Sequence, residues 1–215
     1  MTVTSVEVRL PRESKGKSGV SQSAGSGDRA IAVRPGRPED ARLLAELGAL
    51  AFQHAFGADN SPENMQAYLA QAFGEEIQAR ELDDPASQFL LAEADQTVVG
   101  YARLREGLAP QAIEGTATIE IARFYPHPDW IGRGVGSALM RSCLRLAHRR
   151  RMQTIWLDVW EHNRRARAFY ERWGFRGVGV QAFRLGDDVQ TDILMARSCL
   201  PWAGDTWADG AAFDS

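Results

Sequence analysis

The segment at residues 118–139, TIEIARFYPHPDWIGRGVGSAL, constrains the fold of this chain most strongly. It begins with alternating β-branched residues, passes two prolines, and then places Gly132, Gly134 and Gly136 at every second position. This order predicts a strand, a tight loop and the start of a helix. Glycines let the backbone approach a ligand closely, and the amides of a helix N-terminus attract negative charge. The segment therefore predicts a binding site for a phosphate-bearing ligand.

Length and composition limit the class of protein. The 215 residues suffice for one well-buried domain with tails. Apolar residues at 44% and charged residues at 25% are ordinary for a globular protein, and no apolar run reaches the roughly 20 residues of a membrane span. Cys143 and Cys199 lie in apolar patterns, and no apolar leader precedes a cleavage site. We therefore expect a soluble, cytoplasmic protein without disulfides or a metal.

The net charge of −3 conceals two segments of opposite charge. Residues 131–176 contain eleven Arg against three acids, whereas residues 58–84 contain seven acids against one Arg. A basic segment suits a phosphate-bearing cofactor, and an acidic segment suits a cationic substrate. Each run can equally be the solvated face of a helix.

The pattern along the chain divides it into a domain and two tails. Residues 1–29 are rich in Ser, Gly and charge, which predicts a disordered tail, and residues 201–215 form an acidic tail. Residues 30–200 predict a strand, two or three helices, three antiparallel strands, a helix, a strand, a helix and a final strand pair. This order is typical of a mixed α/β sheet that has one parallel crossover around the glycine loop.

Two nucleotide-binding folds are alternative interpretations of the glycine loop. A Rossmann unit would use Asp158, which follows Gly136 by 22 positions, as its ribose-binding acid. However, the glycines run G-R-G-V-G rather than G-x-G-x-x-G, and the chain continues with an antiparallel pair instead of alternating strands and helices. A P-loop is excluded because no Gly-Lys-Ser/Thr occurs.

Two longer segments resemble a known family. The stretch RFYPHPDWIGRGVGSALM resembles the acetyl-CoA motif of the GNAT superfamily of acyl-CoA N-acyltransferases, and WLDVWEHNRRARAFYERWGF resembles its next motif. The resemblance extends over about residues 31–200 and implies a mixed α/β fold, with a mostly antiparallel central sheet and flanking helices. The stretches FQHAFGADNSPENMQAYLAQAF, IEIARFYPHPDW and TDILMARSCL resemble the bacterial PaiA-like spermidine/spermine acetyltransferases.

The resemblance implies an acetyl-CoA-dependent N-acetyltransferase that binds both substrates and transfers the acetyl group directly to a primary amine. Glu120 would act as the base, through water, and Tyr170 would protonate the departing thiolate. The backbone N–H of Phe124, at an expected bulge, would stabilise the oxyanion. The residues expected to bind the cofactor are Phe124, Tyr125, Ile131, Gly132, Arg133, Gly134, Val135, Gly136 and Asn163.

Each main candidate also has a purely structural interpretation. Glu120 can be a surface residue of a strand, Tyr170 part of an apolar helix face, and Asn163 a helix cap. Two other residues depart from the family's pattern. Ile131 stands where Gln or Arg commonly opens the loop, and Pro126 stands where a Val commonly offers its N–H to the pantetheine arm.

The expected acceptor is a small polycationic amine such as spermidine or spermine, attracted by the acids of residues 58–84. Acetylation of a protein or of another small amine is an alternative, and so is a non-catalytic acyl-CoA-binding sensor. We expect neither nucleic acid nor a membrane as a partner. The resemblance is also compatible with a homodimer.

Overall fold

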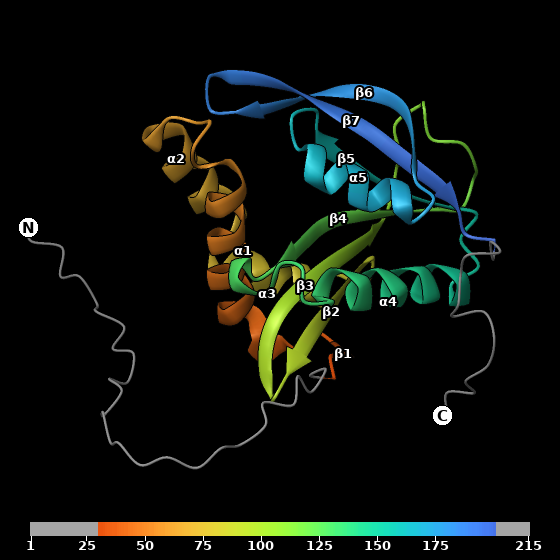
Figure 1. Ribbon diagram of the computed structural model, residues 1–215, viewed down its shortest axis with the longest axis horizontal. Helices are drawn as coiled ribbons and strands as arrows, with labels where there is room; N and C mark the ends of the chain where they lie inside the picture. Colours follow the sequence, from red (N-terminus) through yellow and green to blue (C-terminus); the bar gives the residue numbers. More distant parts are fainter. Residues whose placement is uncertain (1–29, 201–215) are drawn as a thin grey trace, which may run out of the picture.

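The computed structural model describes residues 30–200, and the predicted tails at 1–29 and 201–215 lie outside this range. Within it, seven strands form one sheet in the order β1-β2-β3-β4-β5-β7-β6, with helices on both faces (Figure 1). The pair β4–β5 is parallel and the other pairs are antiparallel. The predicted mixed α/β fold with one parallel crossover is confirmed.

The first part of the chain supplies one edge strand and the helices of one face. Ser61 accepts a hydrogen bond from the Asn64 N–H at 3.2 Å and is the N-cap of α2, with Pro62 at the first helical position. The elements are β1 (Ala32–Pro35), the 3-10 turn η1 (Pro38–Asp40), α1 (Ala41–Phe56), α2 (Pro62–Ala72) and α3 (Glu75–Asp83).

Three antiparallel strands follow, namely β2 (Ser87–Ala94), β3 (Thr97–Glu106) and β4 (Thr118–Pro126). Asp95 and Gln96 connect β2 to β3 with left-handed φ angles of 49° and 63°. Two successive residues with positive φ match the right-handed twist of the flanking strands, which is why a two-residue connection suffices here.

The second part of the chain forms the crossover and the other end of the sheet. Gly174, with φ 81°, follows the C-cap of α5 in the left-handed conformation that glycine favours at a helix end. After β6 the chain turns back, and β7 inserts between β5 and β6. The elements are the 3-10 turn η2 (Pro128–Trp130), α4 (Val135–Arg149), β5 (Thr154–Trp160), α5 (Arg164–Arg172), β6 (Arg176–Leu185) and β7 (Asp188–Ser198).

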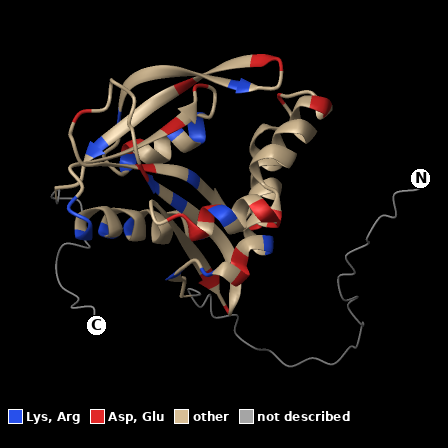
Figure 2. Ribbon diagram, turned by 180° about the vertical axis from the view of Figure 1, so that it is seen from behind, with Lys and Arg blue, Asp and Glu red and all other residues tan. Residues whose placement is uncertain are grey.

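Each face of the sheet has its own layer of helices. Helices α4 and α5 pack on the face that presents Ile155 and Leu157 of β5. Helix α1 packs on the opposite face, where Leu44 meets Phe89 and Tyr101. Arginines occur along α4, whereas acids predominate on α3, so the two predicted charge segments fall on opposite faces (Figure 2). Among residues 30–200, no helix is both long and apolar enough to cross a bilayer.

Candidate active site

The sheet opens between β4 and β5. These strands pair only from Thr118 to Glu120 on β4 and from Thr154 to Trp156 on β5. Beyond that point β4 stays with β3 and β5 stays with β7, so the two parallel strands diverge (Figure 1). Glu120 and Trp156 are the last paired residues and therefore mark the base of the fork.

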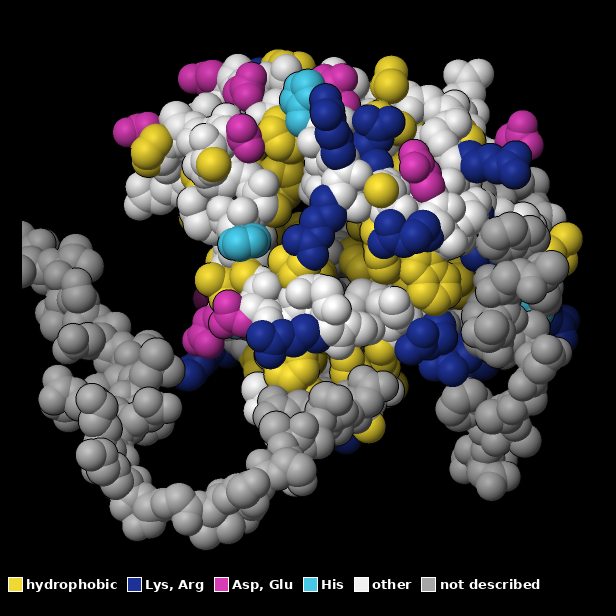
Figure 3. Space-filling view, viewed as in Figure 1, with side chains coloured by type: hydrophobic (Ala, Val, Ile, Leu, Met, Phe, Trp, Pro, Cys, Tyr) yellow, Lys and Arg dark blue, Asp and Glu magenta, His cyan; other side chains and the backbone are white. Residues whose placement is uncertain are grey.

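A cavity of about 760 Å³ occupies this fork. Its walls come from β4 and β5, the glycine loop, the start of α4, helix α5, helix α1 and the β6–β7 hairpin. Figure 3 shows the hollow on this face of the molecule, with apolar side chains inside it and Lys or Arg side chains around it. The cavity has the size of a ligand site and joins both faces of the sheet.

The glycine loop has the backbone conformation that the sequence predicts. Gly132 and Gly134 have φ angles of 84° and 87°, which favour glycine. A Cβ atom at Gly132 would meet no atom within 4 Å, so the backbone there is open to a ligand. Glycine at position 136 is explained by packing, because a Cβ atom there would lie 3.4 Å from the Phe169 ring of α5. The third glycine therefore serves helix packing.

The N-terminus of α4 is free to bind an anion. Its N-cap is Gly134, and within the described residues no side chain caps the helix and no acid lies in its first turn. By contrast, Ser61 caps α2 and Asn163 caps α5. The amides at the start of α4 therefore lack an intrahelical acceptor and point toward the fork. This arrangement fits a pyrophosphate group.

Most of the predicted cofactor-binding residues line the cavity, and two do not. Val135 is fully buried in the core, and the Arg133 guanidinium lies over the Trp130 ring at 5.7 Å. Val135 therefore offers a ligand only its backbone, whereas the exposed side chain of Arg133 lies over Trp130 of the cavity wall. The residues that line the cavity are Phe124, Tyr125, Ile131, Gly132, Gly134, Gly136 and Asn163.

Glu120 lines the cavity at the base of the fork and is paired with an arginine. The Arg105 guanidinium donates to Glu120 Oε2 from Nε at 2.9 Å and from Nη2 at 2.6 Å. Burial raises the pKa of Glu120, and the positive charge of Arg105 opposes this rise. The structural interpretation of Glu120 as a surface residue is wrong, because only 8% of the residue is exposed.

Tyr170 belongs both to the core and to the cavity wall. Its ring contacts Phe124, Phe169 and Phe175, with centroids 6.0, 5.5 and 6.0 Å away. Burial raises the pKa of the Tyr170 hydroxyl, which keeps it protonated at neutral pH. A protonated phenol at the fork is suited to donate a proton.

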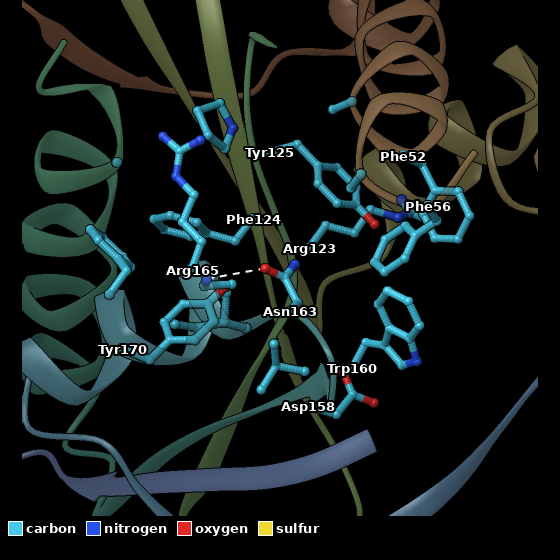
Figure 4. Close-up of a pocket in the computed structure, with 18 of the residues that line it drawn as sticks. Phe52, Phe56, Arg123, Phe124, Tyr125, Asp158, Trp160, Asn163, Arg165 and Tyr170 are labelled. Atoms are coloured by element: carbon cyan, nitrogen blue, oxygen red, sulfur yellow. Dashed lines mark hydrogen bonds between the residues drawn. The ribbon is translucent and has the colours of Figure 1, made fainter. Parts of the chain in front are cut away.

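Asn163 is a helix cap that also faces the cavity. Its side-chain oxygen accepts a hydrogen bond from the Ala166 N–H at 3.1 Å, drawn as the dashed line in Figure 4. The capping role that the sequence suggested is therefore present. The side-chain amide nitrogen is left as a donor toward the cavity.

The predicted bulge lies two residues before its expected position. Arg103 pairs with Arg123 while Leu104 pairs with Ile121, so the extra residue on β4 is Ala122 rather than Phe124. Phe124 pairs regularly with Ala102. The bulge turns β4 just beyond Glu120, where the fork opens.

Most of the acids expected to attract the acceptor do not line the cavity. Of the seven acids in residues 58–84, only Glu81 lines the cavity. Its carboxylate accepts hydrogen bonds from Arg103, at 2.7 Å, and from Arg123. Two guanidinium groups pair with it, so Glu81 does not offer a free carboxylate to a cationic acceptor.

Two further carboxylates on the cavity wall were not among the predicted site residues. Asp158 of β5 and Asp192 of β7 lie on the same face of the sheet as Glu120. The alternation of side chains along β5 places Asp158 on the same face as Trp156 and Trp160, so the sequence could have indicated Asp158 as a residue of the site. No local pattern indicated Asp192, because its position in the cavity wall depends on the insertion of β7 beside β5.

Comparison with known proteins identifies the family. Residues 51–175 match the model of the acetyltransferase (GNAT) family. An uncharacterized N-acetyltransferase of Lactobacillus delbrueckii subsp. lactis is 33% identical over 147 residues, which are 68% of this chain and 85% of the relative. An uncharacterized N-acetyltransferase of Mycobacterium bovis is 32% identical over 158 residues, which are 74% of this chain and 97% of the relative.

The fold is also that of a solved structure. The PaiA N-acetyltransferase from Thermoplasma acidophilum, crystallised in complex with coenzyme A, superimposes with a TM-score of 0.64 at 20% identity. The match covers 79% of this chain and 99% of that protein. Together with the family match and the fork between β4 and β5, these comparisons show that the chain belongs to the GNAT family of acetyltransferases.

Proposed function

We propose that this chain transfers the acetyl group of acetyl-CoA to a primary amine of a polyamine such as spermidine. The observation that carries this proposal is the fork itself, which has an uncapped helix N-terminus on one face and buried carboxylates on the other. The helix N-terminus suits the pyrophosphate of acetyl-CoA, and the carboxylates suit a cationic amine.

The cofactor side of the site consists mainly of backbone. The amides of Ile131 to Gly136 bind the pyrophosphate, and Asn163 contributes its side-chain amide. Acetyl-CoA supplies an activated acetyl thioester at the fork. The N–H of Phe124 is the proposed donor to the thioester oxygen as negative charge develops there.

Proton transfers on the acceptor side involve two residues. The amine nitrogen forms a bond to the acetyl carbon as the carbon–sulfur bond breaks. Glu120 accepts the proton of the attacking amine through water, and Tyr170 donates its proton to the departing sulfur. The products are an N-acetylated amine and the thiol of CoA. Burial of Glu120 and Tyr170 raises both pKa values, which favours a basic carboxylate and a protonated phenol.

An assay of thiol release from acetyl-CoA with a panel of amines tests the function. We expect steady turnover, with a higher kcat/KM for spermidine than for a monoamine of similar length. A protein amine as the better acceptor would contradict the polyamine assignment and leave the acetyltransferase intact. Binding of acetyl-CoA without turnover of any amine or protein would overturn the enzymatic assignment in favour of a sensor.

A further inference from the structure

Asp158 and Asp192 form a pair on the acceptor face of the sheet. Asp158 lies opposite Leu194, and Trp160 lies opposite Asp192, so the two acids are diagonal neighbours on adjacent antiparallel strands. The Cα atoms of such neighbours are about 7–8 Å apart, and their side chains share one face. Both residues line the cavity.

Asp192 is buried without a counter-ion. Only 7% of the residue is exposed, and within residues 30–200 its carboxylate has neither a hydrogen bond nor an ion pair. Asp158 accepts one hydrogen bond, from Gln181 Nε2 at 2.6 Å. Arg105 is the arginine whose charge acts on Asp158, and it already binds Glu120. A buried carboxylate without a cation is unfavourable, so a positively charged ligand would stabilise this wall of the cavity.

Aromatic side chains surround the same end of the cavity. Phe56 of α1 meets Trp160 of β5 with ring centroids 5.8 Å apart, and Tyr68 of α2 meets Phe183 of β6 at 5.6 Å. All four rings line the cavity. Figure 4 shows Trp160 beside Asp158, with Phe56 next to it. Aromatic faces attract ammonium groups and pack against methylene chains, so this end combines the groups that recognise an aliphatic ammonium.

We propose that Asp192, supported by Asp158, binds the ammonium group of the acceptor that does not react, within a box formed by Phe56, Tyr68, Trp160 and Phe183. This inference rests on the proposed function. It places the acceptor along one line of carboxylates, from Glu120 at the fork to Asp192 on β7. The class of acceptor is an aliphatic diamine or polyamine whose positive charges are separated by methylene groups.

The charged surroundings of Asp192 give its binding a pH dependence. The charges of Asp158 of β5 and of Glu161, in the turn after β5, act on Asp192, and the charge of Asp192 acts in turn on the Tyr68 hydroxyl of α2. Burial and the two neighbouring acids raise the pKa of Asp192 to about 7. A cationic ligand favours the ionised carboxylate, so affinity for a diamine should rise as the pH increases through about 7.

Kinetics with two matched amines test the subsite. Diaminobutane carries a distal ammonium group, whereas pentylamine has a methyl group in its place. We expect Asp192→Asn to raise the KM for diaminobutane at least tenfold, with little change in the KM values for pentylamine and acetyl-CoA. Asp188→Asn is the control, because Asp188 is an exposed acid of the same strand and does not line the cavity.

The outcomes separate this inference from the proposed function. If diaminobutane is acetylated and its KM is the same in folded Asp192→Asn and in the wild type, the subsite is wrong and the acetyltransferase remains. If no amine is acetylated, the proposed function fails, and calorimetric titration with diaminobutane decides the subsite on its own. Binding that is lost in Asp192→Asn would then support it, and absence of binding to the wild type would overturn it.

Discussion

The Arg105 guanidinium donates two hydrogen bonds to a single oxygen, Oε2, of the Glu120 carboxylate across strands β3 and β4. The other carboxylate oxygen has no hydrogen bond within residues 30–200. Arg105 stabilises the ionised carboxylate, whereas burial favours the protonated form. The pKa of the proposed base is therefore set by two opposing effects, one of which can be removed by mutation.

Arg105→Gln should move the pH dependence of the enzyme. Loss of the guanidinium leaves the burial of Glu120 unopposed, so the pKa of Glu120 should rise. In the plot of kcat/KM against pH, we expect the part that rises with pH to shift to higher pH by about one unit. Glu120→Gln should flatten that part of the plot. Arg42→Gln is the control, because the Arg42–Glu46 ion pair is exposed. An unchanged pH dependence in Arg105→Gln would show that Glu120 is not the titrating base.

Tyr170→Phe should separate catalysis from packing. The variant keeps the ring that packs against Phe124 and Phe175 and removes only the hydroxyl. We expect kcat to fall by about 100-fold or more with little change in Tm. A variant that unfolds at lower temperature with normal kcat would identify Tyr170 as a core residue only.

Tyr101→Phe is a matched control for that experiment and a prediction of its own. The Tyr101 hydroxyl is buried without a hydrogen-bond partner in the described part of the chain, and Tyr101 does not line the cavity. An unsatisfied buried hydroxyl destabilises the folded state, so its removal should raise the free energy of unfolding by about 1 kcal/mol. We expect kcat to stay unchanged. Loss of stability in chemical denaturation would indicate an ordered water or another partner at this hydroxyl.

Two substitutions at Gly134 should show whether the glycine loop binds an anion. Both Gly134→Asp and Gly134→Asn place a side chain at φ 87°, so both should destabilise the fold by a similar amount, about 1 kcal/mol. Only the Asp variant adds a negative charge at the start of α4. We therefore expect calorimetric titration with CoA to show much weaker binding to Asp than to Asn. Equal affinities would argue against pyrophosphate binding at this loop.

Asp192→Asn should stabilise the protein at alkaline pH. The pKa of Asp192 is about 7 in the folded chain, above the ordinary carboxyl value, so the folded state holds an extra proton between about pH 4 and pH 7. Wild-type stability therefore falls as the pH rises through this window. Because water in the cavity weakens the effect, we expect the variant to gain about 1 kcal/mol at pH 8 and almost nothing at pH 4.

Thermal unfolding at the two pH values measures this difference. Asp188→Asn should show no such dependence, because Asp188 is exposed at the start of β7. If the difference in stability between Asp192→Asn and the wild type is the same at both pH values, Asp192 does not titrate in this range.

Features encoded by neighbouring residues were predictable from the sequence. The cap at Ser61, the left-handed residue Gly174 and the conformations of Gly132 and Gly134 each depend on a few adjacent positions. Hydrophobic periodicity likewise gave the order of the helices and strands within residues 30–200. The parallel crossover followed from the strand, glycine loop and helix in sequence.

Features that join distant strands were not predictable. The partner of Glu120 depends on the register between β3 and β4. That register includes a bulge at Ala122, whereas the family resemblance implied a bulge two residues later. Glu81 sits among acids in the sequence, yet arginines of two strands neutralise it in space. The net charge of residues 58–84 is therefore a poor guide to the cavity, because only Glu81 of its seven acids lines the cavity and two arginines pair with it.

The position of β7 has a consequence for how the enzyme is made. It is the last strand of the described region, yet it lies between β5 and β6, which precede it in the chain. During synthesis from the N-terminus, β5 and β6 leave the ribosome before the strand that must separate them. Until β7 emerges, the acceptor end of the cavity lacks one wall together with Asp192. The glycine loop precedes β7 in the chain, whereas the proposed acceptor site is complete only when residues 188–198 close the sheet.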